Sequence, residues 1–362
     1  MSYTPIMVVK TSALGDVVQA LECLSHFNEA FALENVGIEW VVEEAVAPLV
    51  ALHPLVKMVH TISSKKWKKN ITKPGTWKEI GSAISRLSHT SYSAALDLQG
   101  NVKSALVMRL LKAEKKIGFD RQSASEWPAS YGLDIKLHTS HFKQVRDVYD
   151  HGFTKVYEEL FQKKPVVTGF KPGDLLWHEY ELSKAALELE NFAIIAPGSR
   201  WINKQPDKTL ILALARSLVE SSSETIYLAS GNLSERQLVQ EVAQEINHAR
   251  LKLLPSMSLV EFAYAIYKSK WLVAADSLAL HLAGWLQVPS FGLFGPSSDF
   301  YYAPQAGIHD SWMGKCPYNL SFVKRCEKLR TCSTGACLRQ APQKAVLDQL
   351  DRWIKILNHH RA

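Results

Sequence analysis

The chain has 362 residues, a length that suggests two domains, each large enough to bury its own hydrophobic core. Hydrophobic residues make up 47% and charged residues 21% of it, which is ordinary globular composition and excludes disorder as the overall state. The net charge of +7 indicates an anionic partner, whether a nucleic acid, a phosphorylated metabolite or an acidic membrane surface.

The first half of the chain alternates short apolar runs with helical patterns. Residues 6–9 predict a strand and residues 11–15 a turn of small residues, and Asp16 then opens a helix. Further strands are expected at residues 38–42, 55–62 and 94–98, and a helix at residues 102–111. This alternation is typical of a parallel, doubly wound sheet.

The second half repeats this alternation. Strands are expected at residues 192–196, 225–229, 271–275 and 290–294, and helices at residues 210–218, 236–246, 259–267 and 279–286. An amphipathic pattern at residues 345–357 predicts a final helix. The expected fold class is therefore α/β, with two Rossmann-like doubly wound domains facing a central cleft and ligands at the carboxyl ends of their strands.

Four segments are expected along the chain. They are an N-terminal domain at residues 1–175, a linker at 176–190, a C-terminal domain at 191–342 and a C-terminal helix at 343–362. The N-terminus lacks the pattern of a secretory signal. The longest uncharged stretch, residues 277–298, contains two prolines and three glycines, so helix, turn and strand explain it better than a membrane span. We therefore expect a soluble, cytoplasmic protein.

The first strand-to-helix turn carries one glycine, Gly15, and not the three glycines of a dinucleotide-binding fingerprint. This counts against a nicotinamide or flavin dehydrogenase. Asp16 in the same turn has two interpretations. It could cap the N-terminus of the following helix, where aspartate is a preferred residue. It could also act as a general base that takes a proton from an acceptor hydroxyl.

Two turns of the second half could hold a phosphate. Residues 197–201 are followed by Lys204, a point charge suited to a phosphate, although an ordinary surface loop fits the spacing equally well. Asp276 and Ser277 precede a helix whose N-terminal amides could bind phosphate oxygens. His281 follows one turn later, where a histidine is more often part of the core than a ligand.

Two further clusters have open interpretations. Residues 65–69 hold four lysines around one tryptophan, which fits a solvated face, an anion-docking loop or a membrane-surface patch. The four late cysteines are Cys316, Cys326, Cys332 and Cys337. No two of them are separated by the two-residue gap of common zinc sites. We expect reduced structural thiols there, with a metal site as the alternative.

Six segments, in order, resemble the motifs of one known family. They read KTSALGDVVQAL (10–21), WVVEE (40–44), DLQGNVKSAL (97–106), PGSRWINK (197–204), LPSMSL (254–259) and DS…H…FGPS (276–297). On these motifs the chain is identified as a member of the bacterial ADP-heptose:lipopolysaccharide heptosyltransferases, glycosyltransferase family nine. It is most similar to the heptosyltransferase I branch, which adds the first heptose to Kdo-lipid A. The resemblance implies a GT-B fold, with an acceptor domain first and a donor domain second.

The resemblance also implies a role for each matching residue. Asp16 matches the catalytic base, and Lys204 matches the lysine that holds the donor diphosphate. Glu235 matches the residue that binds the donor ribose, and Met257 one beside the adenine. The rest of the implied donor-binding set is Ser12, Gly15, Ser199, Asp276, Ser277 and His281. The implied acceptor-binding set is a basic loop of Lys65, Lys66, Lys68 and Lys69 together with Gln99, Lys103 and Arg121.

The chain departs from the family pattern at three places. Leu278 stands where the family usually has glycine, Gln205 is followed by proline without the usual tryptophan, and Ser125 stands where an arginine is expected. Glycine allows positive φ and close backbone approach, so Leu278 affects the diphosphate loop directly. The cysteine-rich segment is not explained by the resemblance.

The implied activity is an inverting transfer of heptose from ADP-heptose to Kdo-lipid A. No metal and no cofactor are expected, and the protein would act from the cytoplasm at the anionic inner face of the inner membrane. Two alternatives stay open: a nucleotide-sugar epimerase of similar architecture, and a non-catalytic GT-B-like binding protein, to which Leu278 lends weight. Nucleic-acid binding is not expected, because the basic residues cluster in one lysine run without aromatic stacking motifs.

Overall fold

The computed structural model describes residues 3–169, 172–175, 177 and 190–361. The chain divides into two compact units, Met1–Glu179 (unit 1) and Tyr180–Ala362 (unit 2). The linker expected at residues 176–190 lies outside the described residues, apart from residues 177 and 190. Within the described ranges, no helix combines the length and the hydropathy that a membrane span requires.

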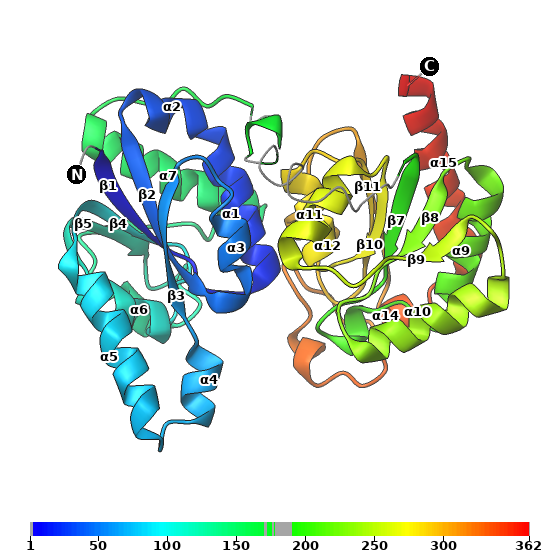
Figure 1. Ribbon diagram of the computed structural model, residues 1–362, viewed down its shortest axis with the longest axis horizontal. Helices are drawn as coiled ribbons and strands as arrows, with labels where there is room; N and C mark the ends of the chain where they lie inside the picture. Colours follow the sequence, from blue (N-terminus) through cyan, green and yellow to red (C-terminus); the bar gives the residue numbers. More distant parts are fainter. Residues whose placement is uncertain (1–2, 170–171, 176, 178–189, 362) are drawn as a thin grey trace. The chain divides into compact units, whose positions relative to one another are not determined.

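Unit 1 is built on six strands in the order β3-β2-β1-β4-β5-β6, and every neighbouring pair is parallel. The strands are β1 (Thr4–Val9), β2 (Val36–Glu43), β3 (Val56–Ile62), β4 (Ser91–Asp97), β5 (Lys112–Phe119) and β6 (Ile135–Leu137). The chain proceeds from β1 to β2 and β3, then returns to the other side of β1 as β4 (Figure 1). Ligands of doubly wound sheets bind at the carboxyl ends of the strands beside such a reversal.

Helices cover both faces of this sheet (Figure 1). They are α1 (Leu14–His26), α2 (Asn28–Leu33), α3 (Ala47–Val50), α4 (Ser64–Lys69), α5 (Pro74–His89), α6 (Val102–Leu110) and α7 (Val145–Phe161), with short 3-10 turns at Glu44–Val46, Trp127–Ser130 and Pro172–Asp174. Met7 and Val9 of β1 pack with Leu87 of α5 and Met108 of α6. On the opposite face, α7 approaches β4 so closely that a β carbon on Gly152 would lie 3.6 Å from the Leu96 side chain. Residues 6–9 of β1 are consecutive buried apolar residues, as expected for a strand that is covered on both faces.

The lysine run expected as a loop forms the short helix α4 instead. The backbone N–H of Trp67 donates to the carbonyl of Ser63 at 2.9 Å, and that of Asn70 to the carbonyl of Lys66 at 3.0 Å. Straight-chain lysines lose little side-chain freedom in a helix, so one and a half turns form readily between Ser63 and Asn70. The expectation of a loop was therefore wrong, because the run forms a short helix.

Unit 2 repeats the topology, with parallel strands in the order β12-β11-β10-β7-β8-β9. The strands are β7 (Phe192–Ala196), β8 (Thr225–Leu228), β9 (Leu251–Leu253), β10 (Leu272–Ala275), β11 (Ser290–Phe294) and β12 (His309–Met313). The helices are α9 (Lys208–Ser221), α10 (Leu233–Ile246), α11 (Leu259–Lys268), α12 (Leu278–Trp285), α13 (Asp299–Tyr302), α14 (Ala336–Arg339) and α15 (Gln343–Arg361), with 3-10 turns at Ile202–Lys204 and Glu327–Arg330. Here the strand order reverses between β7 and β10, so their carboxyl ends are the expected ligand site.

The core of unit 2 ties the C-terminal helix to the sheet. Trp353 of α15 packs edge-on against Trp271, with ring centroids 6.4 Å apart, and lies 5.8 Å from the ring of Phe291. Leu214 and Leu218 of α9 belong to the same buried cluster. The expected final helix is thus confirmed, and so is the α/β fold class with two doubly wound sheets.

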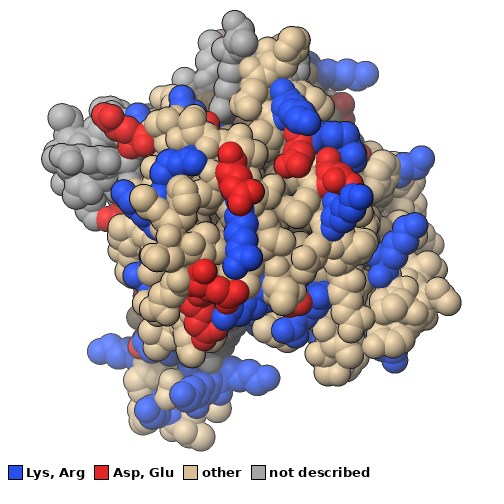
Figure 2. Space-filling view, turned by 90° about the vertical axis from the view of Figure 1, so that its right-hand side faces the viewer, with Lys and Arg blue, Asp and Glu red and all other residues tan. Residues whose placement is uncertain are grey.

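The surface of unit 2 that carries α9 and α10 mixes acidic and basic side chains (Figure 2). Lys208 lies 3.1 Å from Glu241 and 3.3 Å from Glu245, and Arg216 lies 3.7 Å from Glu245. Exposed ion pairs of this kind each contribute little stability. Charges of both signs therefore share this surface, and no broad field of one sign covers it.

Candidate active site

The loops after β7, β10 and β11 meet at one carboxylate in unit 2. Asp276 directly follows β10 and is 5% exposed. Its Oδ2 accepts hydrogen bonds from Lys204 Nζ at 2.5 Å and from the Ser297 hydroxyl, and its Oδ1 lies 3.4 Å from His281 Nε2. The backbone carbonyl of Asp276 accepts a hydrogen bond from Ser199 Oγ at 3.2 Å. The structure thus brings four of the residues expected at the donor site together, and adds Ser297.

The electrostatics of this cluster keep Asp276 ionised. Burial alone would raise its pKa, but the Lys204 ammonium and His281 hold that pKa well below its usual range. Asp276 thereby orients Lys204, whose ammonium has three N–H donors and can still bind an anion. The ring of His281 is buried, and its Nδ1 has no hydrogen-bond partner among the described residues.

Glu235, expected at the ribose, is held in the first turn of α10 by its neighbours. Its Oε2 accepts a hydrogen bond from the backbone N–H of Gly231 at 2.7 Å, and its Oε1 lies 3.5 Å from Gln205 Nε2. A β carbon on Gly198 would lie 2.3 Å from Oε2. A side chain at 198 would therefore force this carboxylate to move.

The departure from glycine at Leu278 causes no backbone strain. Ser277 is the N-cap of α12 and Leu278 its first residue, in an ordinary helical conformation with negative φ. The Ser277 side chain makes no capping hydrogen bond to the first-turn amides of α12. These amides therefore have no side-chain acceptor at the cap that would compete with a phosphate.

Met257, expected beside the adenine, is half-buried in the loop that precedes α11.

In unit 1, the candidate base lies beside a buried lysine. Lys10 directly follows β1, and its Nζ lies 3.8 Å from Asp16 Oδ2 and 5.2 Å from the centroid of the Tyr149 ring. Burial lowers the pKa of Lys10, and the negative charges of Asp16 and Asp97 partly offset this lowering. Sequence reasoning missed Lys10, although its position at the end of a strand beside the ligand edge was a usable signal.

Asp16 is not the N-cap of α1. The helix begins at Leu14 with Ala13 as its cap, so Asp16 is the third helical residue, and its Oδ2 reaches back to the Ala13 N–H at 3.4 Å. That bond is long, and the Asp16 side chain is 42% exposed. Its carboxylate is therefore accessible to a substrate hydroxyl, as the general-base interpretation requires. The capping interpretation does not require this exposure.

Gln99 holds the β1–α1 turn in place. Its Oε1 accepts hydrogen bonds from the backbone N–H groups of Thr11 at 3.1 Å and Ser12 at 2.9 Å. Asp97, buried and with its pKa raised by that burial, in turn accepts from the N–H of Gln99 at 2.8 Å and from Ser104 Oγ at 2.7 Å. Gln99 was expected at the acceptor. In this structure it positions the turn that carries Ser12, Gly15 and Asp16.

The sequence of the chain matches the model of a known family. The model of glycosyltransferase family 9 (heptosyltransferase) matches residues 80–309, more than half of the chain. The chain belongs to glycosyltransferase family 9. It is therefore a glycosyltransferase, and the family expected from the sequence motifs is confirmed. The epimerase and the non-catalytic binding protein are not favoured.

Individual family members are similar to most of the chain. Lipopolysaccharide heptosyltransferase 1 of Pseudomonas aeruginosa is 28% identical over 313 residues, which cover 81% of this chain and 79% of that protein. The structure of the E. coli heptosyltransferase WaaC with ADP superposes with a TM-score of 0.78 at 22% identity, over 96% of this chain and 99% of that one. The structure of E. coli WaaC with ADP-2-deoxy-2-fluoro heptose gives a TM-score of 0.71 at 23% identity, over 86% of this chain and 93% of that one. These structures share the GT-B fold with this family member.

The basic residues expected at the acceptor lie near α4 and beyond β5. Lys66, Lys68 and Lys69 are exposed, and Lys66 pairs with Glu79 of α5 at 2.9 Å. Lys103 Nζ lies 3.3 Å from the hydroxyl of Ser64, at the start of α4. Arg121 lies over the Trp127 ring at 5.4 Å, and the side chain of Lys65 is outside what the structure describes.

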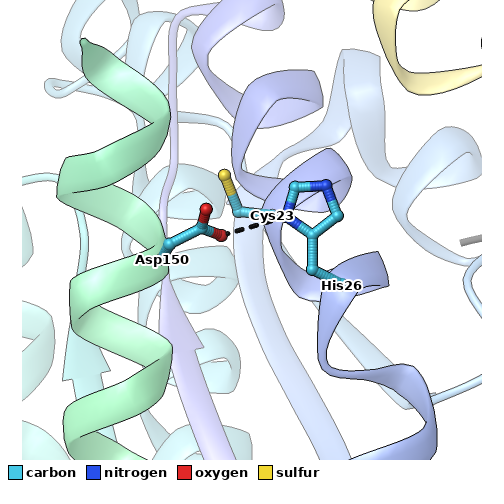
Figure 3. A group of neighbouring side chains, drawn as sticks. All are labelled: Cys23, His26 and Asp150. Carbon is cyan, nitrogen blue, oxygen red and sulfur yellow. Dashed lines mark hydrogen bonds and ion pairs between the residues drawn. The ribbon is translucent and has the colours of Figure 1, made fainter. Parts of the chain in front are cut away.

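A cysteine, a histidine and an aspartate meet between α1 and α7 (Figure 3). His26 Nδ1 lies 3.2 Å from Asp150 Oδ1, and Cys23 Sγ lies 3.5 Å from the backbone carbonyl of Arg146. Burial, with the neighbouring Asp150, raises the pKa of Cys23 well above its usual value. The three side chains come from the packed helices α1 and α7, and the Asp150 carboxylate pairs with His26.

The late cysteines gather around one cavity of about 290 Å³ in unit 2. All four are free thiols: Cys316, Cys326, Cys332 and Cys337. Burial, followed by the charges of Cys316 and Cys332, raises the pKa of Cys337 to about 11. The Thr334 hydroxyl and the Gly335 N–H lower the pKa of Cys332.

Proposed function

We propose that this glycosyltransferase moves a heptose from ADP-heptose to a Kdo-lipid A acceptor with inversion at the anomeric carbon. The relatives named as lipopolysaccharide heptosyltransferases support this reaction, as do the WaaC structures with ADP and a fluorinated ADP-heptose. The observation that carries the proposal is the buried carboxylate of Asp276, which orients Lys204 where the strand order of unit 2 reverses.

Unit 2 would bind the donor. Lys204 and the amides at Ser277 meet the diphosphate, whose negative charge grows as ADP leaves, and this is electrostatic stabilisation of the transition state. Glu235 binds the ribose hydroxyls and Met257 packs beside the adenine. Asp276, Ser297 and His281 act as positioning residues, because they bond to Lys204 or to one another and hold the ammonium in place.

Unit 1 would supply the general base. The acceptor hydroxyl gives its proton to Asp16 as its oxygen attacks the anomeric carbon, and the bond from that carbon to the diphosphate breaks on the opposite side. Lys10, whose Nζ lies 3.8 Å from Asp16 Oδ2, would hold this carboxylate in position for the reaction. Gln99 fixes the turn on which Asp16 stands.

We also propose that the protein works as a peripheral protein at the inner face of the inner membrane. The exposed lysines of α4, with Lys103 and Arg121, would meet the carboxylates of Kdo and the phosphates of lipid A. Flotation with vesicles of anionic lipid, compared with neutral vesicles, tests this. Binding that is equal for the two vesicle types, or absent from both, would contradict it.

The deciding experiment is ADP release from ADP-heptose, measured with and without Kdo-lipid A. Acceptor-dependent ADP release, with product whose anomeric configuration is inverted, supports the proposal. Turnover of the nucleotide sugar without acceptor indicates an epimerase. No binding of ADP or ADP-heptose by calorimetry would indicate a non-catalytic protein.

A further inference from the structure

The segment between β12 and α15 contributes few buried apolar side chains, among them Leu338, which packs in the core of unit 2. It is drawn in orange in Figure 1 and contains regular structure only in the short helical turns Glu327–Arg330 and Ala336–Arg339. Its larger apolar side chains include Tyr318 and Val323, which are 60% and 80% exposed. Ordered segments of this length without regular structure are uncommon in compact domains and need some other constraint. The four cysteines of the cavity all belong to this segment, hereafter the cysteine loop.

The cysteine loop is bonded to the neighbouring turn after β11. The N–H of Cys326 donates to the carbonyl of Pro296 at 2.8 Å, and the N–H of Ser298 to the carbonyl of Lys324 at 2.9 Å. Ser297, between them, forms an isolated bridge with Arg325 and donates its hydroxyl to Asp276. These bonds hold the side of the loop where Pro296 and Cys326 line the cavity.

The chemistry of this donor set fits a soft cation. A site of four thiolate ligands selects zinc or iron over magnesium and calcium. The surrounding charge fits as well, since residues 315–339 contain six basic residues (Lys315, Lys324, Arg325, Lys328, Arg330 and Arg339) and one acidic residue, Glu327. A divalent ion with four thiolates carries a net charge of −2, which these cations would offset.

We propose that Cys316, Cys326, Cys332 and Cys337 bind one zinc or iron(II) ion in a tetrahedral site that fixes the cysteine loop. The four thiols lose their protons to solvent, four metal–sulfur bonds form, and no electron is transferred. In this structure the four cysteines line the cavity, but no three of their sulfur atoms lie within 4.8 Å of one another, so metal binding must draw the loop inward. Nothing in this site depends on the proposed reaction.

The site also borders the donor residues. Asn203, next to Lys204, donates through Nδ2 to the carbonyl of Leu329 at 2.7 Å and lies 3.4 Å from the carbonyl of Cys332. Gly335 has a φ of +58°, and a β carbon there would lie 2.8 Å from Asn203 Cα. Fixing the cysteine loop therefore fixes the backbone that presents Lys204. Only this link rests on the proposed function.

The test is metal content of the full chain, purified under reducing conditions without chelator or metal-affinity tag. We expect one equivalent of zinc or iron by mass spectrometry of the digested protein, and a Co²⁺-substituted form with the absorption of tetrahedral cobalt thiolate. Replacing any of the four by alanine should lose that metal and spectrum. The matched control is Cys23→Ala, which removes the one cysteine outside the cavity and should retain both.

Three results would overturn the proposal. One is a reduced wild-type protein that binds no metal after incubation with Zn²⁺, Fe²⁺ or Co²⁺. Another is metal that persists in all four cavity variants but is lost from Cys23→Ala, which would move the site to the group between α1 and α7. The third is a protein in which the four thiols are paired as disulfides when isolated without oxidant. The wild-type measurements stand even if a variant fails to fold.

Discussion

Each unit places a lysine and a carboxylate together at the end of a strand, but the buried partner differs. In unit 2, Asp276 is 5% and Lys204 16% exposed at the side chain, so the carboxylate is covered and the cation faces outward. In unit 1, Lys10 is 5% and Asp16 42% exposed, so the carboxylate faces outward. The more exposed group of each pair is the one that can meet substrate, which agrees with a cationic donor site and an anionic base.

Replacing Asp16 by alanine should abolish transfer and leave ADP binding unchanged. General base catalysis is worth about 10²–10⁴ in rate, so we expect at least a hundredfold loss in ADP release with both substrates present. Calorimetry with ADP should give the same affinity as the parent protein, because Lys204, Glu235 and Met257, the residues proposed to bind the nucleotide, lie in unit 2. Asp147→Ala, on α7, is the control and should keep full activity. Substantial turnover by Asp16→Ala would remove the base assignment.

Asp276→Asn should destabilise unit 2 in a pH-dependent way. The pKa of Asp276 is lower in the folded chain than in the unfolded chain, so its ionised form adds stability above about pH 4, the ordinary value. Removing this charge leaves Lys204 without its partner, at a cost of about 3 kcal/mol at neutral pH. The difference from the parent protein should shrink as pH falls below about 4 toward the folded-state pKa. Urea unfolding at pH 7 and pH 3 measures this difference in the free energy of unfolding. A difference that is larger at pH 3 than at pH 7 would contradict a stabilising ion pair between Asp276 and Lys204.

At the scale of elements, the loop after β7 and the start of α10 depend on each other through Glu235. Gly198→Ala places a β carbon where Glu235 Oε2 lies, whereas Gly231→Ala places one 3.4 Å away, at ordinary contact distance. We expect Gly198→Ala to weaken ADP binding on the order of tenfold, about 1.4 kcal/mol, and Gly231→Ala to change it less than twofold. Calorimetry on both variants tests the pair, and equal affinities would show that the close approach is unimportant.

The apolar strands and amphipathic helices beside the ligand edges were predictable from the sequence, while other elements were not. β5 was missed because its sequence, KAEKKIGF, carries four charges, and its neighbours β4 and β6 alone make it a strand. For α7 the signal existed, since Val145, Val148 and Phe153 recur at helical spacing. Long-range contacts, such as Ser297 with Asp276 and Lys103 with Ser64, had no local pattern to reveal them.

At the scale of the whole molecule, the cysteine loop and the donor site should respond together. If a metal fixes the loop, its removal frees the backbone that Asn203 holds beside Lys204. We expect a chelator to weaken ADP binding several-fold and added Zn²⁺ to restore it. The chelated protein should still bind anionic vesicles as before, because the lysines of α4 lie in unit 1. An ADP affinity that is the same with and without metal would separate the metal site from the donor site.

The two sheets, each with its own buried cluster, have a consequence for every measurement of heat stability. A chain with two separate cores does not unfold in one all-or-none step, so its calorimetric enthalpy should exceed the van't Hoff enthalpy taken from the width of the transition. A single melting temperature would then average the melting temperatures of unit 1 and unit 2. ADP should shift only the component that belongs to unit 2, while a substitution in the cluster of Met7 and Val9 should shift only the other.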